Sequence, residues 1–581
     1  MKKVILLTLL FTFALLAAIQ VLKAQTLVAY YPFNGNANDE SGNGNNGTPS
    51  GAVLATDRFI LANGCYSFSG GTDVISVPDH PTLNVTTHFS GAAWVYATAT
   101  PPSAGSSNLF SVISKNEGPG LDSPKWIFGL QNGGLAFHNN GTGMGFGHWA
   151  YSNSFTLTLN TWYHIAFSKS GNSITFYLNG NSLGTFSIPV PSNFPAAPLR
   201  MGFSEPSVVM NGRIDDVRLY NNTLSASQIS DIFKKSSLVL SLPFNGDAND
   251  ASGFGNNGTV INGATLTTDR FGNTNSAYLF NGTNQYINVP LNSVFNFGNR
   301  DFSIRAWVNA NNLNPGRRII GAGYEVMDGM WSLGIGINSF WGSNVRMNAV
   351  FHNGSSVVDV NTPSELNTVI NNWYQVCMVR TNGTIRFYVN GKFVGSNAIS
   401  GTILANPVSD LLIGTRARFN PADLIEFFSG KLDDIEVYNT ALSDKIVFDD
   451  YVNDLKRPGS GNTLSLEPGR YVELPDDESW KFAASDFAIE AWIYPQNTAS
   501  LTTLLTQSVA GAAGSVSSFY LGLNYNGSGS LSFYTTTGTG WTHSIASPSG
   551  SIEANKWQHI VVTRQGGQPY IYINGVSQTL S

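Results

Sequence analysis

The chain has little charge and almost no cysteine. Asp, Glu, Lys and Arg make up only 12% of its 581 residues, and the formal net charge of −6 is spread without a basic run. Nucleic acid and anionic membrane surfaces are therefore poor candidates for partners, because both require clustered positive charge. The two cysteines, Cys65 and Cys377, occupy slots that hold small apolar residues in related segments, so we expect buried thiols and no disulfide.

Long apolar runs are absent after the N-terminus. There, Lys2 and Lys3 precede an apolar run from Val4 to about Ile19, which is typical of a secretory signal peptide cleaved after Ala24. The alternative is an uncleaved membrane anchor. The remaining chain is not expected to span a membrane, so the pattern predicts a secreted protein that could also be attached to the cell surface.

Helical periodicity is scarce. It is expected only near 225–234, after a possible serine cap, and in a counterpart from about residue 443. In the segment 174–178, apolar side chains alternate with others, and Asn179-Gly180, the preferred pair for a tight hairpin turn, follows. Similar strand signals recur about every 8–12 residues between Gly- and Asn-rich turns, which predicts an all-β protein of antiparallel sheets packed face to face.

The chain contains long internal repeats. The segment 27–47 returns as 238–258, so that Phe33 and Phe244 are 211 residues apart. Two tryptophan motifs recur three times, at spacings of 68, 66 and 65 residues. The paired tryptophans are Trp94 and Trp162, Trp307 and Trp373, and Trp492 and Trp557. We therefore predict a signal peptide at 1–24 and domains at 25–236, 237–457 and 458–581.

The third copy departs from the pattern at both ends. Its recognisable part begins near Leu464 without the opening Pro32-Phe33-Asn34 motif of the first copy, and it has no counterpart of 212–220. We expect this domain to be incomplete and further domains to follow it in the natural protein.

The shared motifs resemble the laminin-G-like branch of the concanavalin A-like jelly rolls. They are the opening Pro-Phe-Asn-Gly with its Ser-Gly-x-Gly-Asn-Asn-Gly loop, the central Ala-Trp-Val, the Asn-Gly hairpin, and the closing segments 212–220 and 430–438. The resemblance covers nearly all of the mature chain and implies tandem antiparallel β-sandwich domains. Modules of this family bind sugars, bind proteins or space other domains, so fold alone does not name a function.

The resemblance also raises glycosidase chemistry, which the residues do not support. Glucanases of this fold carry a Glu-x-Asp-x-(x)-Glu strand that supplies the nucleophile and the acid. The nearest acidic strands contain Asp216 and Asp434, and Ile214 and Leu432 stand where the first Glu would be. We expect a protein that is not an enzyme.

Four aspartates suggest a metal. Asp39 and Asp250 lie in Gly/Asn-rich loops near the start of a repeat, and Asp215 and Asp433 lie in its closing strand. Since the first and last strands of a jelly roll commonly lie side by side, we predict a structural calcium ion (Ca²⁺) in each complete repeat, bound by one aspartate from each end. The alternative is that Asp39 closes an Asx turn and Asp215 pairs with an arginine.

Tryptophans divide into expected core residues and expected ligand contacts. Three in apolar strands are expected in the core: Trp94, Trp307 and Trp492. Three in Gly-rich, loop-like contexts are candidates for stacking on sugar rings: Trp149, Trp341 and Trp541. Edge packing inside the concave sheet is the alternative for the second set.

Together, these features predict a secreted, non-catalytic array that recognises a polysaccharide or glycoprotein ligand, with tandem copies raising avidity. The alternative is a structural spacer, or an accessory region of a larger extracellular enzyme whose catalytic domain lies outside this chain.

Overall fold

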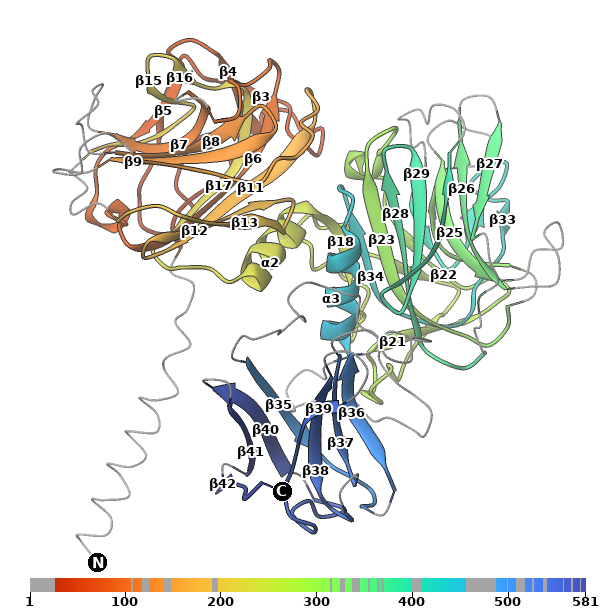
Figure 1. The fold of residues 1–581 in the computed structure, drawn as a ribbon. Coiled ribbons are helices and arrows are strands. Elements are labelled where there is room, and N and C mark those ends of the chain that lie inside the picture. The colour runs from red at the N-terminus through yellow and green to blue at the C-terminus, as the bar shows by residue number, and fades with distance from the viewer. Residues whose placement is uncertain are drawn as a thin grey trace, which may run out of the picture. The chain divides into compact units, whose positions relative to one another are not determined.

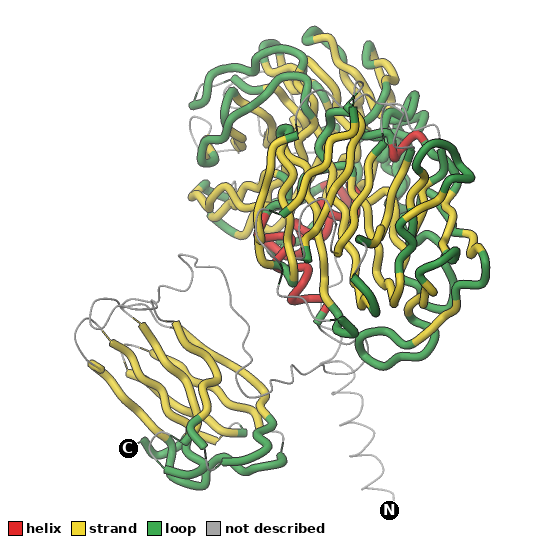
Figure 2. The backbone as a smooth tube through the Cα atoms, turned by 90° about the vertical axis from the view of Figure 1, so that its right-hand side faces the viewer, coloured by secondary structure: helices red, strands yellow, loops and turns green. Residues whose placement is uncertain are grey.

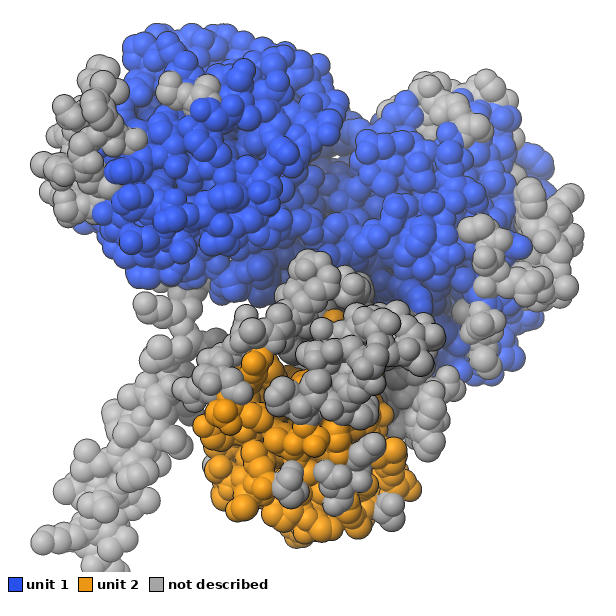
Figure 3. Space-filling model, viewed as in Figure 1, with its two compact units in different colours: residues 1–464 blue, residues 465–581 orange. Residues whose placement is uncertain are grey.

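In a computed structural model the chain divides into two compact units, residues 1–464 and 465–581 (Figure 3). The predicted signal peptide lies outside the described residues. The structure describes residues 27–105, 108–116, 125–140, 148–190, 197–313, 316–323, 330–336, 345–353, 356–362, 366, 370–399, 409–455, 487–498, 500–507, 518–524, 527–536, 541–556, 558–565, 568–574 and 576–580.

Strands dominate the described residues of both units, as Figures 1 and 2 show. All pairs of named strands are antiparallel, which confirms the predicted all-β sandwich architecture. We call residues 27–237 repeat 1, residues 238–455 repeat 2, and the described residues from 487 onward repeat 3. Among the described residues, no helix is long and apolar enough to cross a membrane.

Repeat 1 is a sandwich of an eight-stranded and a seven-stranded sheet. The eight-stranded sheet has the order β13 (Asn181–Ser187), β12 (Ser173–Leu178), β11 (Trp162–Ser170), β6 (His88–Ala97), β17 (Asn211–Tyr220), β4 (Cys65–Ser69) and β3 (Val53–Ala55), with β1 (Leu27–Tyr31) paired to β17. The seven-stranded sheet has the order β10 (His148–Tyr151), β9 (Gly134–Asn140), β8 (Lys125–Gln131), β7 (Phe110–Asn116), β14 (Leu199–Met201), β5 (Val74–Val77) and β2 (Thr48–Ser50). A short hairpin joins β15 (Phe203–Glu205) to β16 (Val208–Val209), and a 3₁₀ turn covers Pro81–Leu83.

Repeat 2 has the same two sheets. Its eight-stranded sheet has the order β20 (Thr265–Thr267), β21 (Ala277–Asn281), β34 (Ser429–Tyr438), β23 (Phe302–Ala310), β28 (Tyr374–Thr381), β29 (Thr384–Val389) and β30 (Lys392–Ala398), with β18 (Leu238–Leu242) paired to β34. Its seven-stranded sheet has the order β19 (Thr259–Ile261), β22 (Tyr286–Val289), β31 (Leu411–Ile413), β24 (Arg317–Ala322), β25 (Trp331–Gly336), β26 (Arg346–His352) and β27 (Val357–Asn361). The remaining elements are the hairpin of β32 (Arg416–Ala417) and β33 (Leu424–Ile425), and a 3₁₀ turn at Ser293–Phe295.

Repeat 3 shows two four-stranded sheets in its described residues. One has the order β35 (Phe487–Ile493), β40 (Gln558–Gln565), β41 (Gln568–Ile573) and β42 (Val576–Ser577). The other has the order β36 (Thr502–Gln507), β37 (Ser518–Leu523), β38 (Leu531–Thr536) and β39 (Trp541–Ala546).

The predicted hairpins and helices are confirmed. In β12, Ile174 and Phe176 are fully buried in the core between the sheets, and Asn179 adopts the left-handed conformation (φ 46°) that the turn requires. Helix α2 (Ala226–Ser237) begins at a Ser225 cap, and α3 (Asp444–Asp454) begins at a Ser443 cap. Each helix follows the closing strand of its repeat.

The tryptophans of the Ala-Trp-Val motifs lie on the outer face of the eight-stranded sheet. Ala93 and Val95 point into the sandwich core of repeat 1, so the period of two turns Trp94 to the opposite side. Trp94 and Trp307 are nevertheless buried, with 2% and 3% of their surface exposed, because the helix after the closing strand packs on each of them. The prediction that Trp492 lies in the core is wrong, because this residue exposes 64% of its surface.

Both cysteines are buried and unpaired, as the sequence predicted. Burial raises the pKa of the Cys65 thiol to about 12 and also raises that of Cys377. Because the thiolate is the reactive form, both side chains are neutral thiols at pH 8 in the folded protein.

We therefore expect neither thiol to react with Ellman's reagent at pH 8 while the chain is folded. Unfolding in guanidinium chloride returns the pKa of both thiols to the range of free cysteine, and two equivalents should then react. Rapid reaction of the native protein would contradict the burial of these side chains.

Candidate functional site

The Asp39 carboxylate organises the loop that follows β1. Its Oδ1 accepts hydrogen bonds from the backbone N–H groups of Tyr30 and Ser41, and its Oδ2 accepts from the Ser41 hydroxyl and the Asn45 N–H, each at 2.9 Å. Four donors therefore occupy the two oxygens. This is the Asx-turn alternative, and N–H groups cannot serve as ligands of a cation.

The same arrangement recurs in repeat 2. Asp250 accepts from the N–H groups of Ser241, Ser252 and Asn256 at 2.9 Å and from the Ser252 hydroxyl at 2.7 Å. The loop motif is thus explained in both repeats by backbone organisation.

Asp215 lies buried in β17 and forms an ion pair with the guanidinium of Arg58. Arg58 also contacts Asp216 (Nη2 to Oδ2, 3.1 Å) and donates to the carbonyl of Ser236 at the end of α2 (2.8 Å). Burial raises the pKa of Asp215, and the positive charge of Arg58 opposes that rise. The pair joins the loop before β4 to the closing strand.

Asp433 has the equivalent partner in repeat 2. Arg270 Nη1 lies 2.9 Å from Asp433 Oδ2 and 2.8 Å from Asp434 Oδ2. A guanidinium shared between two carboxylates supplies the positive charge that a metal would otherwise provide. Burial raises the pKa of Asp433, with Asp434 adding to the rise and Arg270 opposing it.

The four aspartates do not fit a calcium shell as they are placed. The partners of Asp39 and Asp250 are N–H and O–H groups, and the partners of Asp215 and Asp433 are guanidinium groups. In the part of the chain that the structure describes, no three His, Cys, Asp or Glu side chains come together as possible metal ligands. The contacts favour the alternative of an Asx turn and an arginine pair.

Trp149 lies in β10, at the edge of the seven-stranded sheet of repeat 1, and not in the loop that its glycine-rich surroundings suggested. It stands opposite His138 of β9, and their ring centroids are 4.4 Å apart. The ring of Tyr151 lies 5.9 Å from that of Trp149, with only 2° between their planes. We call Trp149, Tyr151 and His138 the aromatic strip.

The aromatic strip lies on the outer face of the sheet. Its neighbour Ala150 points into the sandwich core, so the period of two directs Trp149 and Tyr151 outward. Buried Leu109, Ile127, Ala136 and Val208 form the apolar cluster against which both half-buried rings pack. A rigid cluster of this kind holds the rings in a fixed orientation.

His138 is neutral at physiological pH. Burial, together with the nearby positive charge of Lys125, lowers its pKa to about 4. Lys125 in turn pairs with Glu205 (Nζ to Oε2, 2.9 Å). The strip therefore presents uncharged rings beside a balanced ion pair.

Sequence reasoning identified Trp149 but missed Tyr151 and His138. The spacing of Trp149 and Tyr151 was the available signal, since residues two apart in a strand share a face. His138 becomes a neighbour only through the pairing of β9 with β10.

The other two candidate tryptophans cannot be placed in the same way. Trp341 lies outside the described residues. Trp541 begins β39, but its side chain lies outside what the structure describes.

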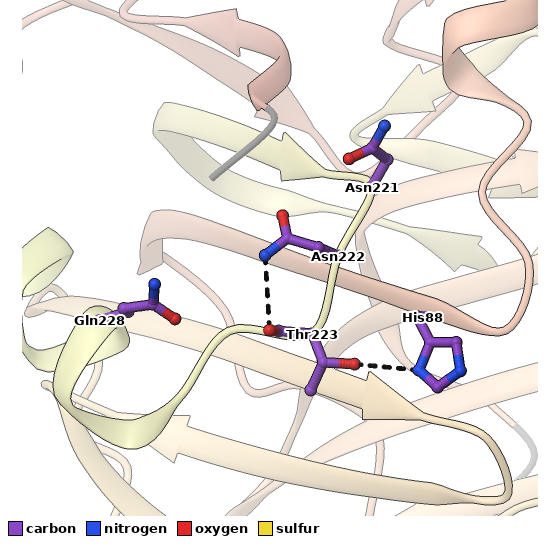
Figure 4. A pocket seen from close by; sticks show the side chains of 5 residues that line it. All are labelled: His88, Asn221, Asn222, Thr223 and Gln228. Carbon is purple, nitrogen blue, oxygen red and sulfur yellow. Dashed lines mark hydrogen bonds between the residues drawn. The ribbon is translucent and has the colours of Figure 1, made fainter. Parts of the chain in front are cut away.

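A polar cavity of about 340 Å³ opens beside the N-terminus of α2 (Figure 4). It is lined by His88, Asn221, Asn222, Thr223 and Gln228. Several of these groups already have partners: His88 Nδ1 lies 3.3 Å from the Thr223 hydroxyl, and Gln228 Oε1 accepts from the backbone N–H of Ser225, the residue that caps α2. No aromatic ring other than imidazole lines the cavity, so it lacks a flat apolar surface for a sugar ring.

A sequence profile of the concanavalin A-like lectin/glucanase superfamily, in its laminin-G-like form, matches residues 69–230, 281–447 and 467–579. These segments make up more than half of the chain, and each overlaps one repeat. The chain belongs to this superfamily. The resemblance seen in the sequence is thereby confirmed.

Solved structures give weaker likenesses to these concanavalin A-like repeats. Domain 4 of an extracellular arabinanase from Geobacillus stearothermophilus, solved with arabinotriose, is 20% identical, with a TM-score of 0.29 over 36% of this chain and 100% of its own. The receptor-binding domain of a botulinum neurotoxin C/D mosaic serotype is 12% identical, with a TM-score of 0.30 over 58% of this chain and 73% of its own. At such scores these likenesses carry no argument. No curated protein sequence matches the chain significantly.

The second concanavalin A-like repeat carries a different surface at the place of the aromatic strip. Its edge strand β27 turns Asp359 outward between Val358 and Val360, which pack on the core. Nearby, the guanidinium groups of Arg318 and Arg416 hold Glu426, and although burial opposes them, the pKa of Glu426 falls to about 2. The two repeats therefore share a fold but present aromatic and charged surfaces, respectively.

We expect Arg58→Ala to destabilise the first concanavalin A-like repeat by about 3–5 kcal/mol, because Asp215 and Asp216 would lose their shared cation while buried. Hydrogen exchange of the β6 and β17 amides would measure the loss. Arg213→Ala is the control: it removes a half-buried guanidinium from β17, the strand that carries Asp215 and Asp216, and should cost about 1 kcal/mol or less. If both variants lose the same free energy of unfolding, the buried ion pair does not stabilise the repeat more than an ordinary surface contact does.

Chelation should have no effect on stability. Since hydrogen bonds and guanidinium groups already satisfy the four aspartates, we expect EDTA to leave the melting temperature of the full chain unchanged. A fall in melting temperature that added Ca²⁺ reverses would restore the calcium hypothesis.

Proposed function

We propose that the chain is a secreted, non-catalytic binding protein, and that repeat 1 holds a glycan on the outer face of its seven-stranded sheet. The observation that carries the proposal is the pair of parallel rings, Trp149 and Tyr151, fixed on a buried apolar cluster. Sugar rings expose C–H groups on their faces, and these groups pack on aromatic faces that are held in place.

Polar groups next to the aromatic strip suit the hydroxyl groups of a sugar. Glu205, whose side chain is 21% exposed, offers carboxylate oxygens as acceptors where it pairs with the buried Lys125. Ligand sites commonly combine an apolar surface with a few polar groups of this kind. Membership in a superfamily that includes lectins supports the same class of ligand.

The positions of the carboxylates support binding without catalysis. Retaining and inverting glycosidases place two carboxyl groups on either side of the scissile bond. Glu205 is held by Lys125, while Asp215 and Asp216 lie in the other sheet, engaged by Arg58. The secreted location rests on the signal-peptide pattern of residues 1–24.

We expect Trp149→Ala to weaken binding of the full chain to its best polysaccharide by about 30-fold, as loss of an aromatic anchor typically does. The ligand would come from a panel of arabinan, xylan, β-glucan and mannan tested by affinity electrophoresis. Trp162→Ala is the matched control, because it removes a half-buried tryptophan from the eight-stranded sheet and should leave binding unchanged.

Two results would contradict the proposal. If no polysaccharide or glycoprotein of a broad panel retards the protein in electrophoresis, the spacer alternative is favoured. Release of reducing sugar that stops on mutation of Glu205 would show an enzyme.

A further inference from the structure

Repeats 1 and 2 are joined without a linker. Helix α2, which packs on the eight-stranded sheet of repeat 1, ends at Ser237, and β18, the first strand of repeat 2, begins at Leu238. The backbone N–H of Asn439 in repeat 2 donates to the Ser237 carbonyl at 2.9 Å, so the last residue of the helix is already held by the next repeat. A flexible hinge needs residues without such contacts, and none lies between these two elements.

Helix α2 contacts both repeats. Ile229 and Ile232 lie in one buried cluster with Ala166 and Tyr177 of repeat 1. Phe233 lies in a second buried cluster, to which repeat 2 contributes Cys377, Val379, Tyr388, Tyr438, Leu442, Ile446 and Val447. The same helix therefore completes the outer face of repeat 1 and forms an apolar interface with repeat 2.

The Asn-Gly turn of repeat 1 lies close to both helices. A Cβ atom at Gly180 would lie 3.0 Å from Phe233 Cδ1 of α2 and 3.2 Å from Ile446 Cδ1 of α3. Beside the turn, the Ser443 hydroxyl that caps α3 donates to Asn181 Oδ1 at 2.9 Å. The missing side chain at Gly180 is what allows this close approach.

A loop of repeat 1 enters the core of repeat 2. Phe59 is 7% exposed and belongs to the main buried cluster of repeat 2, where its ring lies edge-on to Phe254 with centroids 4.9 Å apart. The carbonyl of Arg58 accepts from Arg300 Nη1 at 2.8 Å and from Asn439 Nδ2 at 3.3 Å. Because the guanidinium of the same arginine holds the closing strand of repeat 1, one loop fixes both that strand and the next repeat.

An ion pair crosses the interface between the helices. Lys234 Nζ of α2 lies 2.5 Å from Asp450 Oδ1 of α3, and 17% and 4% of these side chains are exposed. Charges buried to this extent need a partner at contact distance. The pair therefore favours the one orientation of the two helices in which both charges are matched.

We propose that repeats 1 and 2 form one rigid body, which unfolds in a single cooperative step and keeps the two repeats in one fixed orientation. The outer faces of their seven-stranded sheets, aromatic in repeat 1 and charged in repeat 2, are then held at a constant separation. A partner that contacts both faces must match that separation, and a ligand bound to either repeat stabilises both. This inference does not depend on what repeat 1 binds.

Double electron–electron resonance on the full chain tests the fixed orientation. Nitroxide labels would be attached at Thr48→Cys and Thr259→Cys, two exposed positions on the equivalent strands β2 and β19. The buried Cys65 and Cys377 should stay unlabelled. The control pair, Thr48→Cys with Ser187→Cys, lies within repeat 1. We expect the distance distribution between the repeats to be as narrow as the one within repeat 1.

Native-state hydrogen exchange tests the single unfolding step. In the full chain, the slowest amides of β6 in repeat 1 and β23 in repeat 2 should exchange with the same dependence on denaturant. Phe59→Ala should speed both by at least about 10-fold, because it removes a ring buried between the repeats. Phe271→Ala is the matched control: it removes the equivalent but half-exposed ring of repeat 2 and should speed them by less than about threefold.

Three results would overturn the proposal. They are a broad distance distribution between the repeats beside a narrow one within repeat 1, exchange of β6 and β23 at different denaturant concentrations, and faster exchange of β6 alone in Phe59→Ala. The distance measurement does not use the Phe59 variant, so it decides the question even if that variant fails to fold.

Discussion

The closing strand of each complete repeat enters the middle of the eight-stranded sheet, and the rest of the repeat depends on this placement. β17 pairs with β1, β4 and β6, so it joins the first strands of the repeat to the central ones. The Arg58–Asp215 ion pair fixes the same strand to the loop before β4. The helix that follows then covers Trp94, so one terminal segment completes both the sheet and the packing on its outer face.

This placement leaves the outer faces of the two sheets with different roles. In repeats 1 and 2 the outer face of the eight-stranded sheet packs on a helix. The outer face of the seven-stranded sheet keeps its rings half-buried in repeat 1 and carries arginines around Glu426 in repeat 2. Repeats 1 and 2 therefore both cover the outer face of one sheet with a helix and differ on the outer face of the other.

Many of the few charged residues of this chain form ion pairs inside the repeats. Several of the arginines form buried pairs: Arg58 with Asp215, Arg270 with Asp433, and Arg318 with Glu426. A buried charge is tolerated only with a partner at contact distance, so these pairs specify which segments meet. These pairs fix which strand and loop segments lie next to one another.

Local patterns in the sequence were sufficient for the strands, the hairpins and the two helices, because alternation, Asn-Gly turns and serine caps act over a few residues. The Ile174–Phe176 alternation, the left-handed Asn179 and the Ser225 cap are confirmed for that reason. The alternation also predicts that Trp94 points to the opposite side of the sheet from Ala93 and Val95. It does not predict which segment covers that outer face. In the structure, helix α2 covers it, and the Phe233 ring that stacks on Trp94 comes from a distant part of the chain. Likewise, the sequence suggested calcium at Asp215, and only the tertiary structure shows that this carboxylate contacts a guanidinium from a residue 157 positions away. The sequence by itself determined the elements and their faces, and only the tertiary structure decided the partner of each face, because those partners come from distant segments.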